Sequence, residues 1–256
     1  MDDIEAYNRQ AWDSQVERKN RWTLPVDETT ISAAKEGRWE VVLTPQRPVP
    51  SDWFPMPFAG CELLGLASGG GQQAPIFAAA GAHVTVLDNS RKQLQQDQAV
   101  AQREGLSIRS VLGSMRDLSC FADEQFDVVF NPCSVSFIPE VQSVFQEAYR
   151  VLRPGGRLLC GFINPARFIF DEAELEAGRV IVRHPLPYAD STRLGLAEQD
   201  KLRAEDEPFM FSHSWEDLIS GQLRAGFTLR DLIEDSSPED VLANFLPTFF
   251  ATLATK

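Results

Sequence analysis

Three consecutive glycines, at positions 69–71, interrupt the stretch LLGLASGGGQQAPIFAAAGAHVTVLDNS of residues 63–90. A glycine-rich turn between a strand and a helix lets a ligand approach the backbone closely, because no Cβ atom intervenes. The helix beyond the turn presents unpaired N–H groups. Asp88 ends the next apolar run, where its carboxylate can accept both hydroxyls of a ribose. The spacing predicts a nucleoside site; an ordinary tight turn with a surface aspartate is the alternative.

The register of the turn argues against a dinucleotide. The glycines nominally fit the fingerprint G-x-G-x-x-G/A, with Ala74 in the last position. That fingerprint starts directly after the last inward-facing apolar residue of the strand, which is Leu66 here, but two residues separate Leu66 from Gly69. The wider turn suits a ligand with a zwitterionic tail better than one with a pyrophosphate.

Side chains that could act as a general base are few. The histidines are His83, His184 and His213. His83 opens a strand at the end away from the expected ligand, so a structural role is the better interpretation. His213 precedes a helix and is retained as a candidate substrate contact. We assign no catalytic base from the sequence.

Segments with strand and helix patterns alternate from residue 61 onward, at lengths typical of βαβ crossovers. The pattern predicts an α/β fold: a Rossmann-like, doubly wound, seven-stranded sheet, mainly parallel with an antiparallel edge strand, and helices on both faces. We expect strands at 61–67, 83–88, 107–113, 126–131, 157–163, 228–235 and 245–255, and helices at 72–81, 90–105, 141–152 and 214–227.

The flanking segments complete a single domain of residues 1–256. A helix is expected at 3–19, a second helix capped by Asp27 or Thr29, and a short strand at 39–43. Five prolines mark 44–60 as a connector. We divide the domain into an N-terminal helical cap and linker, a ligand-binding core, a lid insertion, and a C-terminal helix with edge strands: 1–58, 59–164, 165–212 and 213–256.

Composition limits the kinds of binding partner and the cellular compartment that we expect for this protein. The net charge of −13 disfavours nucleic acid, because such a surface repels phosphates. The four cysteines are widely spaced without zinc-like pairing, so we expect reduced thiols, no metal and a cytoplasmic protein. No apolar run is long enough to span a membrane, and the N-terminus does not read as a secretory signal. The oligomeric state is open.

Four further stretches carry a family resemblance: VLDNS (86–90), GSMRDLSCF (113–121), FDVVFNPCSVSF (126–137) and EAYRVLRPGGRLLCGF (147–162). The last is the most specific, since it runs a helix into L-R-P-G-G and a strand. With them, the chain resembles the class I S-adenosylmethionine-dependent methyltransferases, most of all the ubiquinone/menaquinone-biosynthesis-like (methyltransferase type 11) group. The resemblance covers about residues 60–164 and implies S-adenosylmethionine as cofactor and a small-molecule methyl acceptor.

The first family motif, an acidic residue followed by G-x-G-x-G, departs from its pattern here. The acidic position falls on Gly65 and the first glycine on Ala67. Glu62 cannot substitute, because it has the opposite strand parity to Gly65. Recognition of the methionine amino group must then come from backbone carbonyls or from residues elsewhere.

The resemblance implies roles for individual residues. Asp88 would hold the ribose, with Asn89 beside it. Asp117 or the backbone around Met115 would serve the adenine amino group, where the family often has an acidic residue at the position of Ser114. The full set implied for the cofactor is Ala67, Ser68, Gly69, Gly71, Asp88, Asn89, Ser114, Met115, Arg116, Asp117, Asn131, Pro132 and Cys133.

For the acceptor we expect an apolar chamber walled by aromatic side chains of the N-terminal segment and the lid, which would favour a sulfonium by cation–π attraction. The candidate contacts are Tyr7, Trp12, Ser134, Phe137 and His213. Transfer would be an in-line displacement. A cofactor-binding protein without transferase activity is the main alternative. An NAD(P)-dependent oxidoreductase is a third hypothesis, but it would need a dinucleotide turn and a catalytic pair that the sequence lacks.

Overall fold

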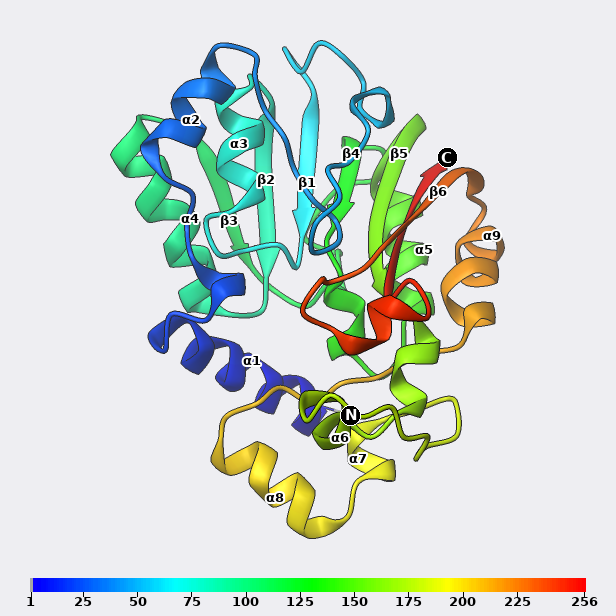
Figure 1. Ribbon diagram of the computed structural model, residues 1–256. Helices are drawn as coiled ribbons and strands as arrows, with labels where there is room; N and C mark the ends of the chain where they lie inside the picture. Colours follow the sequence, from blue (N-terminus) through cyan, green and yellow to red (C-terminus); the bar gives the residue numbers. More distant parts are fainter. Residues whose placement is uncertain (1) are drawn as a thin grey trace.

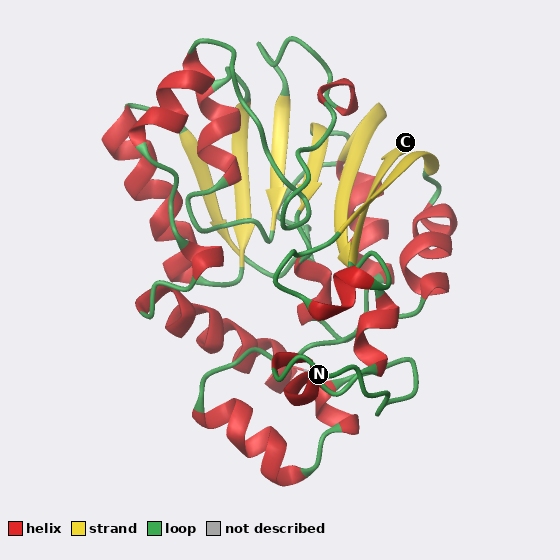
Figure 2. Cartoon of the chain, in the orientation of Figure 1, coloured by secondary structure: helices red, strands yellow, loops and turns green. Residues whose placement is uncertain are grey.

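A seven-stranded sheet forms the centre of residues 2–256, which are the residues that this computed structural model describes (Figures 1 and 2). Met1, part of the expected cap, lies outside them. The strand order is β3-β2-β1-β4-β5-β7-β6, with the first five strands parallel and β7 antiparallel to both neighbours. The predicted fold class is therefore confirmed. The strands are β1 Glu62–Leu66, β2 His83–Asp88, β3 Ile108–Leu112, β4 Phe126–Asn131, β5 Leu152–Ile163, β6 Thr228–Asp235 and β7 Phe249–Thr255.

The central strands are buried on both faces, which explains their nearly continuous apolar sequences. Successive residues of β1 enter different cores: Leu63 packs on the side of α2 and α3, and Leu64 on the side of α5. The helices are α1 Asp2–Glu17, α2 Glu28–Lys35, α3 Gln73–Ala79, α4 Arg91–Glu104, α5 Gln142–Val151, α6 Glu172–Glu176, α7 Asp190–Arg193, α8 Leu196–Ala204 and α9 Gly221–Ala225.

Local signals set several of the helix ends. The Asp27 side chain accepts a hydrogen bond from the Thr30 amide, so the expected cap of α2 is confirmed at Asp27. Ser90 caps α4 in the same way, and Gly105 ends that helix in a left-handed conformation. These ends fix where β2 and α4 meet beside the glycine turn.

Of two expectations about the flanking elements, one is wrong and the other differs from the structure in helix type. The strand predicted at 39–43 is wrong, because only an isolated bridge joins Val42 to Pro48. The prolines that follow have no N–H with which to continue a ladder. The helix predicted at 214–227 is present, but its first turn, Glu216–Ser220, is π-helical and continues directly into α9.

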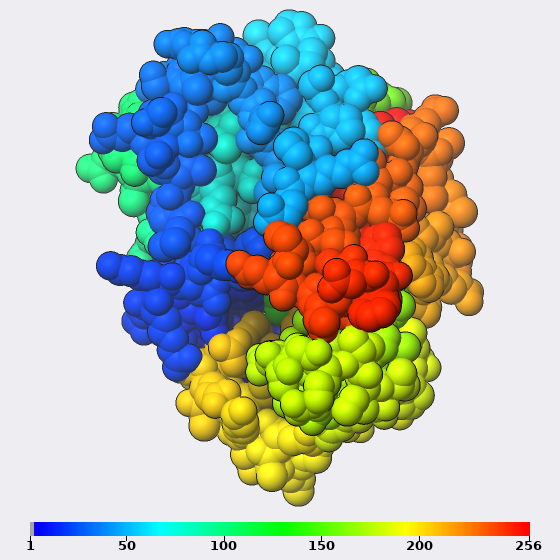
Figure 3. All heavy atoms as spheres, viewed as in Figure 1, coloured from blue at the N-terminus to red at the C-terminus, as the bar shows by residue number. Residues whose placement is uncertain are grey.

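The N-terminal helix and the segment 165–212 lie beyond the carboxyl ends of the parallel strands (Figure 1). In the space-filling view this segment, yellow-green to yellow, fills the lower part of the molecule, beneath the blue N-terminal and the red C-terminal residues (Figure 3). The Tyr7 hydroxyl of α1 donates to the carbonyls of Leu202 and Glu207, at 3.1 and 2.8 Å. Asn8 bonds the carbonyls of Phe137 and Phe209. Helix α1 is thus fixed to both the turn after β4 and this segment.

Candidate functional site

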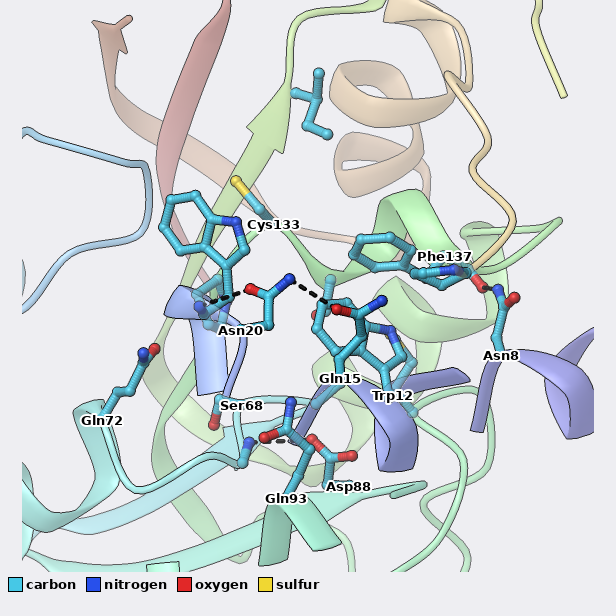
Figure 4. Close-up of a pocket in the computed structure, with 18 of the residues that line it drawn as sticks. Asn8, Trp12, Gln15, Asn20, Ser68, Gln72, Asp88, Gln93, Cys133 and Phe137 are labelled. Atoms are coloured by element: carbon cyan, nitrogen blue, oxygen red, sulfur yellow. Dashed lines mark hydrogen bonds between the residues drawn. The ribbon is translucent and has the colours of Figure 1, made fainter. Parts of the chain in front are cut away.

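A cavity of about 400 Å³ lies at the carboxyl ends of β1, β2 and β4 (Figure 4). Its floor is formed by the turns after these strands, and its roof by α1, the linker after it and residues 207–210. Of the residues expected to contact a cofactor or acceptor, those lining the cavity are Trp12, Ala67, Ser68, Gly69, Asp88, Asn89, Met115, Pro132, Cys133, Ser134 and Phe137.

Each glycine amide of the turn is already bound to an acceptor of the protein. The Gly69 N–H donates to Asp88 Oδ2, the Gly70 N–H to the Gln93 carbonyl and the Gly71 N–H to Asp97 Oδ1, each at 3.0 Å. A turn that binds a pyrophosphate must offer its amides to the phosphate oxygens. Here two carboxylates and a backbone carbonyl hold the three amides instead, so this geometry disfavours a dinucleotide phosphate.

The turn also shows why small residues stand in it. A Cβ at Gly69 would lie 2.8 Å from Gln93 Cβ, closer than carbon atoms can approach. Ala67, at the first glycine position of the family motif, has φ = +47°, a left-handed conformation that glycine adopts more easily. Strained residues of this kind cluster at functional sites.

Asp88 has the geometry of a diol acceptor. Its side chain is buried, and its two oxygens accept the amides of Gly69, at 3.0 Å, and Ser90, at 2.8 Å. Each carboxylate oxygen can accept a further hydrogen bond. Burial raises the pKa of Asp88 to about 6, against the lowering effect of these amides. A buried carboxylate with spare acceptor capacity at the cavity wall fits the two hydroxyls of a ribose.

Asp97 of α4 lies beneath the turn and was missed by sequence reasoning. It is fully buried, and its Oδ2 has no hydrogen-bond partner among the described residues. Burial raises the pKa of Asp97 well above its ordinary value. The sequence signal that could have identified Asp97 is its position one helical turn after Gln93, which places both on the face of α4 that meets the glycines.

Asn131 ties the floor together from below. Its amide nitrogen donates to the Leu66 carbonyl and to Ser134 Oγ, both at 2.6 Å, and its oxygen accepts the Cys160 thiol at 3.2 Å. Asn131 is completely buried, so it positions the cavity floor. Cys133 lines the cavity with φ = +49°, and its thiol donates to the Leu43 carbonyl. Burial raises the pKa of this thiol, which therefore stays protonated.

The third motif contributes one residue to the cavity, Met115. Ser114 and Arg116 both bond the Glu5 carboxylate of α1, so they fix that helix to the loop. The Asp117 carboxylate is exposed and accepts a hydrogen bond from the Ser119 amide. Hydrogen bonds from Ser119 lower the pKa of Asp117. The structure therefore places Asp117 away from the cavity.

Two expected acceptor contacts also lie elsewhere. Tyr7 spans from α1 to the 165–212 segment, as described above. His213 has φ = +53°, its Nε2 bonds the Val135 carbonyl at 2.9 Å, and burial lowers its pKa. The aromatic lining comes from Trp12, Trp22, Phe137 and Phe249. Other aromatic side chains of the N-terminal segment and of residues 165–212 are buried outside the lining: Trp53, Phe54, Phe168, Tyr188, Phe209 and Phe211.

Amide side chains of the cavity wall were not predicted. Asn8, Gln15 and Asn20 belong to the roof, whose segments show no motif, and Gln72, Gln73 and Gln93 lie at the N-terminal ends of the helices beside the glycine turn. Among the described residues that line the cavity, Asp88 and Glu207 are acidic and none is lysine, arginine or histidine.

The missing acid of the first motif has a structural counterpart. A Cβ at Gly65 would lie 2.4 Å from Ser68 Oγ, so the serine hydroxyl fills the place where a larger side chain would begin. This hydroxyl is buried and has no hydrogen-bond partner among the described residues. An acidic residue at position 65 would require the Ser68 hydroxyl to leave this place.

Comparison with known proteins places these features in a family. A model of the methyltransferase domain matches residues 64–160. The chain is 47% identical to the uncharacterized methyltransferase YbaJ of Bacillus subtilis, over the full length of both proteins. None of the helices in residues 2–256 is long and apolar enough to cross a membrane.

Solved structures resemble the fold at low sequence identity. An S-adenosylmethionine-dependent methyltransferase from Mesorhizobium loti superposes with a TM-score of 0.61 at 16% identity, covering 80% of this chain and 94% of that one. The 1,6-didemethyltoxoflavin-N1-methyltransferase of Burkholderia thailandensis, solved with 1,6-didemethyltoxoflavin and S-adenosylhomocysteine bound, superposes with a TM-score of 0.62 at 15% identity, covering 98% of this chain and 88% of that one.

Proposed function

The chain belongs to the class I S-adenosylmethionine-dependent methyltransferases, and from this premise we propose that it binds S-adenosylmethionine in the cavity above the glycine turn and methylates a small molecule there. The observation that carries the proposal is Asp88, a buried carboxylate with free acceptor capacity beside a turn whose amides are already bound. That pairing fits an adenosine and leaves no cradle for a pyrophosphate.

The residues present fit the parts of this cofactor. Asp88 would hold the ribose hydroxyls, and Asn89 and Met115 would lie against the adenine. The turn of residues 67–69 would face the methionine part, and Pro132 and Cys133 the sulfur. When bound, the cofactor supplies an electrophilic methyl group on a positively charged sulfur.

The chain's own contribution is alignment and exclusion of water. Trp12 and Phe137, in edge-to-face contact at 4.9 Å, close the cavity beside Met115. The protonated Cys133 thiol and the buried His213 are unsuited to removing a proton from an acceptor. We therefore propose an acceptor whose nucleophilic atom needs no strong base. The lid role of 165–212, the division into segments and the cytoplasmic location remain predictions.

The test compares ligands by titration calorimetry. We expect saturable binding of S-adenosylhomocysteine and none of NAD⁺ or NADP⁺. Binding of a dinucleotide in place of S-adenosylhomocysteine would refute the proposal. Transfer of label from methyl-labelled S-adenosylmethionine to a small-molecule fraction then separates a transferase from a protein that only binds the cofactor.

A further inference from the structure

Glu207 is a carboxylate of the cavity wall that has no cationic partner in the described structure. It is half-buried and follows α8. The neighbouring acid Asp206 pairs with Arg18 at 2.7 Å, and the ion pairs of the described 165–212 segment do not include Glu207. On α8, the Arg203 guanidinium packs over the ring of Phe209. Glu207 thus lines the cavity without an ion pair to a described residue.

A chain of hydrogen bonds holds Glu207 in place. The Trp22 amide donates to Asn20 Oδ1 at 3.0 Å, Asn20 Nδ2 donates to Gln15 Oε1 at 2.8 Å, and Gln15 Nε2 donates to Glu207 Oε1 at 3.1 Å. Figure 4 shows Asn20 and Gln15 joined over the cavity. Because the Gln15 oxygen is already bound, its amide must present N–H to Glu207. One carboxylate oxygen is fixed and the other is available.

The charges of the cavity favour a cationic ligand group. Asp88 and Glu207 together give the described lining two negative charges and no positive one. Withdrawing a carboxylate from water is costly unless a cation pairs with it. The rings of Trp12 and Trp22, which share the roof, also attract cations.

We propose that Glu207 binds an ammonium group of a molecule held in the cavity, an inference that rests on the proposed function. Two molecules can supply that group. One is the methionine part of the cofactor, for which the chain lacks a carboxylate at Gly65. The other is a methyl acceptor with a basic nitrogen.

The first experiment tests the cofactor as the source. Glu207→Gln is the probe variant, since the new amide oxygen can still accept from Gln15. Glu205→Gln, on the exposed side of the same segment, is the matched control. The ligands are S-adenosylhomocysteine and 5′-methylthioadenosine, which shares the nucleoside and sulfur but has no amino acid. If the cofactor supplies the ammonium, E207Q weakens S-adenosylhomocysteine at least about tenfold and leaves 5′-methylthioadenosine unchanged.

The second experiment tests the acceptor as the source. Protein saturated with S-adenosylhomocysteine is titrated with three indoles of similar size: tryptamine, 3-methylindole and indole-3-propionate. If the acceptor supplies the ammonium, wild type and E205Q prefer tryptamine at least about tenfold, and E207Q loses that preference while its affinity for S-adenosylhomocysteine is unchanged.

The outcomes separate the inference from its premise. If E207Q behaves as wild type in both experiments, including the case in which no indole binds, the inference is overturned while the proposed function stands. If wild type binds neither S-adenosylhomocysteine nor 5′-methylthioadenosine, the proposed function fails and the inference falls with it. Equal thermal midpoints of the three proteins show that the variants are folded.

Discussion

Replacing Asp88 with alanine is the sharpest test of the adenosine site. In the structure each carboxylate oxygen accepts one amide, and a carboxylate oxygen can accept one more hydrogen bond, here from a ribose hydroxyl. Hydrogen bonds to a charged group contribute about 1.5–3 kcal/mol each. Part of that is offset in the variant, because water can reach the vacated space. We expect a net loss of about 1–3 kcal/mol in binding free energy, or about 5- to 150-fold in affinity for S-adenosylhomocysteine.

The assay is calorimetry with adenosine and 2′,3′-dideoxyadenosine, which lacks the two hydroxyls. Wild type should prefer adenosine, and D88A should bind the two nucleosides equally. Asp123→Ala is the matched control, because the Asp123 side chain is 75% exposed and pairs with Arg150 at the surface. If D88A keeps the preference for adenosine, or binds S-adenosylhomocysteine as wild type does, the ribose assignment is refuted.

The same residue predicts a pH dependence. The ionised carboxylate is the form that accepts two hydroxyls, and burial raises its pKa to about 6. Affinity should therefore fall as pH falls through about 6 in wild type, whereas D88A should show no such step. The effect of pH on the stability of the fold has the opposite sign. A raised carboxylate pKa contributes stability that is present below the unfolded value of about 3.9 and lost as pH rises through about 6.

Three other variants test the structure around the cavity. Asp97→Asn keeps an oxygen that accepts the Gly71 amide and removes a buried acid of raised pKa. The thermal midpoint of the variant should therefore exceed that of wild type at pH 8, and the difference should shrink at pH 5. A lower midpoint at pH 8 would contradict this. Asn131→Ala leaves the Leu66 carbonyl unpaired and should cost about 1–3 kcal/mol in urea unfolding, and a change within error would count against its role. Tyr7→Phe removes the hydroxyl that donates to the carbonyls of Leu202 and Glu207, so it should cost about 0.5–1.5 kcal/mol and speed limited proteolysis of the 165–212 segment. Unaltered cleavage would argue against this tether.

The core of the fold was predictable because its signals are local. A few neighbouring residues are enough to recognise an apolar strand, a helix cap such as Ser90 or the glycine turn. Asp88 follows from the same logic, since parallel strands bring their carboxyl ends to one edge of the sheet. The strand expected at 39–43 failed because neighbouring prolines outweighed its apolar residues.

The roof of the cavity was not predictable in the same way. Gln15 and Glu207 meet across 192 positions of sequence, and neither belongs to a motif. His213 looked like a substrate contact because it precedes a helix, yet tertiary packing turns its ring toward the Val135 carbonyl. Such contacts depend on how α1 and the 165–212 segment dock, which no short window of sequence encodes.

The position of β7 has a consequence for how the molecule is assembled on the ribosome. β7 lies between β5 and β6 although it is the last strand of the chain, and it carries Phe249 of the cavity wall. During translation the free side of β5 stays without a neighbour until residues 249–255 emerge. Nascent or prematurely terminated chains should therefore be prone to aggregation through that open edge, and ligand binding should begin only after synthesis has reached the last strand.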